Sequence, residues 1–317
     1  GSVMFINLFK KGFVMMMTSL TLFSCSSSSS DLSEAPTTSV EDNRPVLNVV
    51  IIAGQSNAVG NGYLVDLKEE DRKDYSSILY YGKGDVADFE KVSYVSSKLG
   101  KGNGFDLNSF GMEVGMAKKM VGLESSNERF GIIKCAYNGS SIVKDVDPSR
   151  GDWNVFDEQG NGRNAYDLID AIKNGTEAFE KLDYRVRYVG VAWMQGEADY
   201  QTCNDYHKRF KALMELIRKE TNREDLPFAI GELAKQNYPD RENPFYKSID
   251  YLKKKGEGLV DIVEIKDIKP RCTYEEANKG KYGEWDFVHW SGYEMVTIGE
   301  MFLDSLLAMD QLVKNPQ

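Results

Sequence analysis

The chain has 317 residues, of which 41% are hydrophobic, and its 49 acidic against 39 basic residues give a net charge of −10. This length suffices to bury a core without disulfide bonds. The acidic balance argues against nucleic acid and anionic membrane surfaces as partners.

The N-terminal segment has the features of a bacterial lipoprotein signal. A basic stretch at 4–11 is followed by apolar residues at 13–23, which are too few to span a bilayer as a helix. Leu22-Phe23-Ser24-Cys25 resembles a lipobox with Cys25 at the lipidated position. We therefore expect a cloning remnant and signal peptide over 1–25, and an exported protein anchored in a membrane only through the lipid on Cys25.

Residues 26–45 begin with five serines and predict a flexible tether. The folded domain is expected over 46–317. There, apolar runs alternate with amphipathic segments, which predicts a parallel sheet with helices on both faces, a three-layer α/β/α sandwich. Strands are expected at 46–53, 77–81, 130–136, 186–194, 226–232 and 260–265, and helices at 109–122, 164–181, 204–220, 244–255 and 292–312.

Polar turns follow three of these strands. Gly54-Gln55-Ser56-Asn57 comes directly after the first strand, Asn138-Gly139-Ser140-Ser141 after the third, and Gln195-Gly196-Glu197 after the fourth. The carboxyl ends of parallel strands share one edge of a sheet, where ligands bind in open α/β folds. Ser56 is therefore the candidate nucleophile. Glycine-turn N–H groups and the Gln195 amide are candidate oxyanion donors, although a turn serine that only caps a helix is the alternative.

A serine nucleophile needs a base, and the chain has two histidines. His207 lies among apolar residues with helical spacing, which indicates a structural position. His289 follows Asp286 by three residues, just before the last predicted helix. This spacing allows Asp286 to orient one ring nitrogen while the other faces Ser56. The alternative is that Asp286 only caps the helix entry.

Other polar and aromatic residues near these turns are candidates for substrate contacts. An aromatic face suits the C–H face of a sugar ring, and core packing is the alternative for each tryptophan. Glu197 and Asp199 could be a glycosidase pair, but carboxylates two residues apart on one turn more naturally brace loops. The candidate substrate contacts are Gln55, Asn57, Trp153, Glu197 and Trp290.

Cysteine and histidine spacing predicts neither a metal site nor a cofactor. Cys135, on a predicted strand, reads as a small buried hydrophobe. A disulfide between Cys203 and Cys272 stays open, because pairing does not follow from sequence.

Taken in order, these motifs resemble the SGNH hydrolases, and within them the sialic-acid-specific acetylesterases that include carbohydrate esterase family 6. The matching blocks are Gly54-Gln55-Ser56-Asn57, Asn138-Gly139-Ser140-Ser141, Trp193-Met194-Gln195-Gly196-Glu197 and Asp286-Phe287-Val288-His289. Phe110-Gly111-Met112-Glu113 is similar to a further family stretch, Phe-Gly-Pro-Glu, but lacks its proline.

The resemblance implies a flavodoxin-like strand order and a Ser56–His289–Asp286 triad. It also implies an oxyanion hole made by the N–H groups of Ser56 and Gly139 and the side chain of Gln195. The function expected is removal of O-acetyl groups from an acetylated carbohydrate. The alternatives are a glycan-binding lipoprotein without turnover and a lipid or thioester hydrolase of the same fold.

Overall fold

A seven-stranded sheet forms the centre of the computed structural model, which describes residues 42–86, 89–98, 102–156, 162–268, 270, 288–290 and 292–314. The described residues from Asn43 onward form one unit. In spatial order the sheet runs β4-β3-β6-β1-β7-β8-β9. The strands are β1 (Val46–Gly54), β3 (Asp74–Gly84), β4 (Ser93–Ser96), β6 (Glu128–Ala136), β7 (Arg185–Met194), β8 (Phe228–Gly231) and β9 (Val260–Val263).

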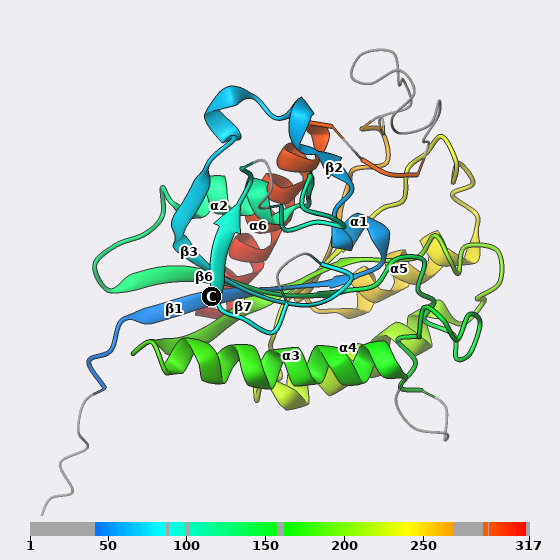
Figure 1. Ribbon diagram of the computed structural model, residues 1–317. Coiled ribbons are helices and arrows are strands. Elements are labelled where there is room, and N and C mark those ends of the chain that lie inside the picture. The colour runs from blue at the N-terminus through cyan, green and yellow to red at the C-terminus, as the bar shows by residue number, and fades with distance from the viewer. Residues whose placement is uncertain are drawn as a thin grey trace, which may run out of the picture. The chain divides into compact units, whose positions relative to one another are not determined.

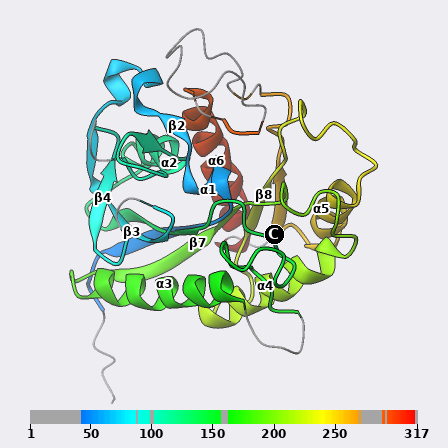
Figure 2. The ribbon, with the colours of Figure 1, turned by 45° about the vertical axis from the view of Figure 1, so that its right-hand side comes forward.

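Six of these strands are parallel to their neighbours, and β4 adds an antiparallel edge beside β3. The five strands β6-β1-β7-β8-β9 follow the order 2-1-3-4-5 in chain order, which is the flavodoxin-like arrangement. β3 and β4 extend the sheet beyond β6, while β8 and α5 lie toward the other edge (Figure 2). The predicted fold class is confirmed.

The side chains of β1 contribute to the hydrophobic core on both faces of the sheet. Its side chains alternate between the faces of the sheet, as a strand requires. Leu47, Val49 and Ile51 pack into the core beneath one set of helices, whereas Val50 and Ile52 pack into the core on the opposite face. A strand buried on both faces is apolar at nearly every position, and in this segment only Asn48 interrupts the hydrophobic run.

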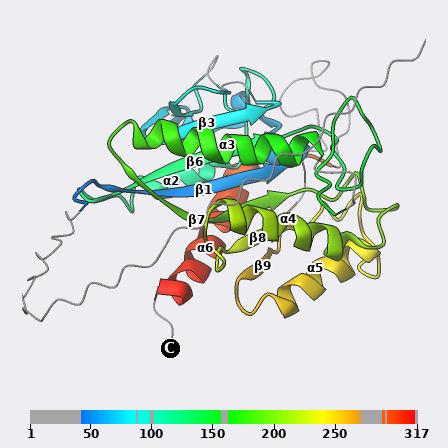
Figure 3. The ribbon, with the colours of Figure 1, turned by 90° about the horizontal axis from the view of Figure 1, so that it is seen from below.

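Helices cover both faces of the sheet (Figure 1). α3, α4 and α5 cross one face, as the view from below shows (Figure 3), and α2 and α6 lie on the other. No helix within the described ranges is long and apolar enough to cross a membrane. The helices are α1 (Ser56–Val59), α2 (Glu113–Met120), α3 (Arg163–Glu180), α4 (Tyr206–Glu220), α5 (Pro244–Lys255) and α6 (Glu294–Lys314).

The helix predicted at 109–122 begins later than expected. Ser109–Phe110 instead forms a short strand, β5, which pairs with β2 (Gly62–Tyr63). α2 therefore starts only at Glu113. This strand could not be predicted, because two residues are too few to show a periodicity.

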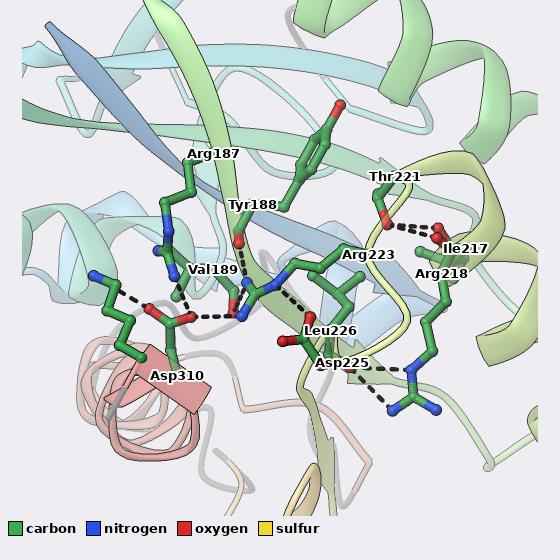
Figure 4. Close-up of polar contacts among 11 residues, drawn as sticks. Arg187, Tyr188, Val189, Ile217, Arg218, Thr221, Arg223, Asp225, Leu226 and Asp310 are labelled. Atoms are coloured by element: carbon green, nitrogen blue, oxygen red, sulfur yellow. Dashed lines mark hydrogen bonds and ion pairs between the residues drawn. The ribbon is translucent and has the colours of Figure 1, made fainter. Parts of the chain in front are cut away.

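The amino-terminal edge of the sheet is tied to α6 by a buried carboxylate (Figure 4). Asp310 accepts hydrogen bonds from Arg187 at 2.6 Å and from Arg223 at 2.8 Å. Burial alone would raise the pKa of Asp310, but the two guanidinium groups hold it below its usual value. This cluster joins β7, the segment after α4, and the last helix.

Cys203 is a free, buried thiol in the structure. Burial, together with the neighbouring Asp199 charge, raises its pKa to about 12. Cys272 lies outside the described residues. Cys135 is fully buried in β6, as predicted.

Candidate active site

Ser56 lies at the carboxyl edge of the sheet, on the turn that leaves β1. The backbone N–H of Gln55 donates to the carbonyl oxygen of Met194 at 2.8 Å, which fixes this turn against the end of β7. Ser56 then opens the short helix α1 and is 6% exposed. The chain thus presents one hydroxyl at the edge where the central strands end.

His289 supplies the partner of this hydroxyl. Its Nε2 lies 2.8 Å from Oγ of Ser56, although 233 positions separate the two residues in the chain. A neutral imidazole with an unprotonated Nε2 would accept the serine proton at this distance. Asp286, the predicted orienter, lies outside the described residues. His207, by contrast, lies in α4 and contacts Ser248 and Tyr251 of α5.

Asn57 connects the nucleophile turn to the histidine segment. Its Nδ2 donates to Oε1 of Glu197 at 2.8 Å and to the carbonyl oxygen of Val288 at 3.0 Å. Its Oδ1 accepts from the backbone N–H of Trp290 at 3.3 Å. The side chain is fully buried, and its hydrogen bonds are made to protein groups. It holds protein segments together.

Gln195 departs from its predicted role. Its Nε2 donates to the carbonyl oxygen of Ser140 at 3.0 Å and to the carboxylate of Asp199, and its Oε1 accepts from the hydroxyl of Tyr206 at 2.8 Å. Two acceptors on one side and a hydroxyl on the other fix the orientation of the amide. Both amide hydrogens are used within the protein, so Gln195 has none left for an oxyanion.

Two backbone N–H groups remain as candidate oxyanion donors. Within the described part of the chain, neither Ser56 N–H nor Gly139 N–H donates a hydrogen bond. Gly139 has a φ of 62°, a left-handed conformation that favours glycine, and it belongs to the turn that follows β6. Asp85 holds this turn by accepting from the backbone N–H of Asn138 at 2.9 Å. The sequence analysis did not identify Asp85, which lies 53 positions before Asn138 in the chain.

The predicted aromatic contacts to sugar are also corrected. Trp153 and Trp290 are both fully buried. The indole N–H of Trp153 donates to Oγ of Ser140 at 2.7 Å, and that of Trp290 donates to the carbonyl oxygen of Ile268 at 2.8 Å. Gln55 is engaged through its carbonyl end, because its Oε1 accepts from the N–H groups of Gly196 and Ala198. All three side chains are buried and make their hydrogen bonds to neighbouring loop residues.

The two carboxylates of the third motif differ in their surroundings. Asp199 accepts from the hydroxyl of Ser141 and the N–H of Ile142, which confirms that it braces the loops. Burial raises the pKa of Glu197, while its contact with Asn57 and the charge of His289 oppose that rise. Oε2 of Glu197 is buried and makes no hydrogen bond to the described residues.

Metal ligation finds no support among the residues that the structure describes, which contain no suitable group of three or more His, Cys, Asp or Glu side chains. The chemistry available is that of a hydroxyl, an imidazole, backbone donors and a carboxylate.

Solved structures with the same architecture include NanS, with a TM-score of 0.60 and 15% identity over 85% of this chain and 99% of that one. A protein from Arabidopsis thaliana gives 0.55 and 16%, covering 83% and 98%. A carbohydrate acetylesterase from Xanthomonas citri gives 0.51 and 16%, covering 83% and 56%. At these identities the likeness establishes the fold.

A comparison with curated protein sequences gave no match. A sequence profile of the family described as carbohydrate esterase, sialic acid-specific acetylesterase, matches residues 46–308. The match spans the first strand, the nucleophile turn, the histidine segment and most of the last helix. The chain therefore belongs to this family of carbohydrate esterases, which remove acetyl groups from carbohydrates.

Proposed function

We propose that Ser56 and His289 are the nucleophile and the general base with which this carbohydrate acetylesterase cleaves O-acetyl esters. The observation that carries the proposal is the 2.8 Å distance between Oγ of Ser56 and Nε2 of His289. An imidazole at hydrogen-bond distance is what a serine hydroxyl needs to become a nucleophile. Asp286 is assigned the orienting role on its position three residues before His289.

The reaction proceeds in two acyl-transfer steps. Oγ of Ser56 attacks the acetyl carbonyl carbon as its proton passes to Nε2 of His289, and the negative charge collects on the carbonyl oxygen. The N–H groups of Ser56 and Gly139 donate to that oxygen. The ester bond to the sugar breaks, and the sugar oxygen takes the proton from Nε2. Water then attacks the carbonyl carbon of the acetylated Ser56 as its proton passes to Nε2 of His289, and acetate leaves as that proton returns to Oγ of Ser56.

Acetate release from a panel of acetylated glycans tests the proposal. The panel should contain O-acetylated sialic acid and acetylated neutral polysaccharides, together with p-nitrophenyl esters of acetate and of a long acyl chain. We expect acetate from at least one glycan, preference for the acetyl ester, and no release by Ser56→Ala. Preference for the long acyl chain would favour a lipid hydrolase, and binding without release would favour a glycan-binding protein.

We also propose that the protein is a lipoprotein anchored through Cys25. The support is the sequence of a basic segment, an apolar stretch, a lipobox-like tetrapeptide and a serine-rich tether. Cys25→Ser should move the protein from the membrane fraction to the soluble fraction of the native host, with esterase activity retained. Ser27→Ala, two residues along the same tether, is the matched control. Unchanged partitioning of Cys25→Ser would rule out the anchor.

A further inference from the structure

Lys134 is a fully buried cation on a central strand. It lies in β6 opposite Ile52 of β1, two residues before the turn that leads to Ser56. Its strand neighbours Ile132 and Ala136 belong to the apolar core on the face covered by α2 and α6. An ammonium group in such a core is costly unless every hydrogen has a partner.

All three ammonium hydrogens of Lys134 have acceptors on three separate segments. Nζ lies 2.6 Å from the carbonyl oxygen of Val59, the last residue of α1, and 2.9 Å from the carbonyl oxygen of Asn103. The third acceptor is Oε2 of Glu113, at 2.9 Å, on the first residue of α2. Lys134 therefore holds the carboxyl-terminal end of the helix that begins with Ser56.

Glu113 completes the arrangement with its second oxygen. Oε1 accepts from the backbone N–H of Gly111 at 2.8 Å, and the side chain is fully buried. Gly111 in turn lies directly against Gly60, the residue after α1, where an added Cβ would come within 2.4 Å of the Gly111 Cα atom. The Phe110-Gly111-Met112-Glu113 segment thus forms the surface against which α1 ends.

α1 needs such support because it has only four residues. Helices this short are not stable on their own, since too few backbone hydrogen bonds repay the cost of nucleation. Its amino-terminal end is fixed by β1 and β7, and its carboxyl-terminal end by Lys134. A displacement of either end would move Oγ of Ser56 relative to the imidazole of His289.

We propose that Lys134 and Glu113 are positioning residues that hold α1 so that Ser56 stays in line with His289. Neither residue contacts the reacting atoms. The ion pair by itself is weak evidence of a stabilising role, because replacing a buried ion pair by apolar residues of similar volume is often neutral or stabilising. The inference rests on the proposed role of Ser56.

The decisive variant replaces both members, Lys134→Met with Glu113→Leu. Turnover should be expressed per Ser56 site titrated with an organophosphorus reagent, so that misfolded protein is not counted. We expect a thermal midpoint above that of either single variant, kcat for p-nitrophenyl acetate lowered on the order of 10- to 100-fold, and KM within about 2-fold of wild type. The rate of Ser56 phosphonylation should fall by a similar factor.

A folded double variant with wild-type kcat would overturn the proposal. If the double variant does not fold, Glu113→Gln takes its place, because it keeps an acceptor for Gly111 N–H and removes the charge opposite Lys134. Its kcat per titrated site should fall with KM preserved, and wild-type kcat would again overturn the proposal. Asp310→Asn is the control, which should lower stability at unchanged kcat. Labelling of wild type at a serine other than Ser56 would instead refute the proposed function.

Discussion

The side chain of Asn57 donates a hydrogen bond to the backbone of Val288, so the residue after Ser56 holds the residue before His289. Asn57→Asp keeps the shape of the side chain but replaces its two donors by an acceptor that faces Oε1 of Glu197 and the Val288 carbonyl oxygen. Turnover should fall on the order of 100-fold because His289 is displaced from Ser56. Steady-state kinetics per titrated site measure this. Wild-type turnover would mean that Asn57 does not position the histidine.

Ser56 and His289 should lose activity as a unit. Each alanine variant should abolish most acetyl ester hydrolysis, and the double variant should be little worse than either, because a serine without its base is nearly inert. Asp286→Asn should be severely impaired through loss of the correct imidazole tautomer. His207→Ala, in α4, is the control and should keep its turnover. Multiplicative losses in the double variant would contradict a shared mechanism.

Gln195→Ala should lower both stability and turnover. It leaves the buried carbonyl oxygen of Ser140 without its side-chain donor, and a buried unsatisfied group costs about 1–3 kcal/mol. It also removes one of several donors to Asp199 and one of the two acceptors of Tyr206, whose hydroxyl keeps the backbone carbonyl oxygen of residue 195. Tyr206→Phe removes one of these contacts and should show a smaller loss of both. Thermal unfolding and kcat, measured together, distinguish a structural role of Gln195 from a direct role as an oxyanion donor. A loss of kcat of about 100- to 1,000-fold at unchanged stability would identify Gln195 as a direct oxyanion donor.

Glu197→Gln tests the charge beside His289. The imidazolium that forms during attack is stabilised by a nearby carboxylate, and glutamine keeps the acceptor for Asn57 while removing that charge. We expect a lower kcat, and an acid limb of the profile of kcat/KM against pH that moves to lower pH, because the protonated ring is less favoured. An acid limb that stays in place would show that Glu197 has no electrostatic part in the reaction.

Asp310→Asn should destabilise the protein in a way that depends on pH. Its pKa in the folded state lies below the usual value, so its contribution is present above the unfolded pKa of ~3.9 and is lost as pH falls through the folded value. Near neutral pH we expect a loss of about 1.5–3 kcal/mol in the free energy of unfolding. Urea titrations of wild type and variant should converge in strong acid. If the difference in the free energy of unfolding between wild type and variant stays constant with pH, the ionised carboxylate of Asp310 is not its source.

The sequence was sufficient to predict what depends on strand periodicity. The run at 46–53 predicted a strand buried on both faces, and parallel strands bring their polar turns to one edge, so the meeting of the Ser56 turn with the Gly139 and Gln195 turns followed from local patterns. The histidine contact was found by elimination, since only His289 lay outside an amphipathic helix.

The remaining features depend on contacts between distant segments. Trp153 belongs to a polar segment, yet its indole packs 5.2 Å from the ring of Trp193 and donates to Ser140. The Gln195 amide is committed by Tyr206 and Ser140, 11 and 55 positions away. Lys134 interrupts the apolar part of β6 that begins at Phe130, and only the fold reveals that its acceptors surround it.

The place of β1 between β6 and β7 has a consequence for how the protein unfolds on warming. Edge strands can separate from a sheet by local opening, but the backbone before Ser56 is bonded on both sides and exchanges its amide hydrogens only when the whole domain opens. We therefore expect the amides of β1 to be among the slowest to exchange on warming, slower than those of the edge strands β4 and β9.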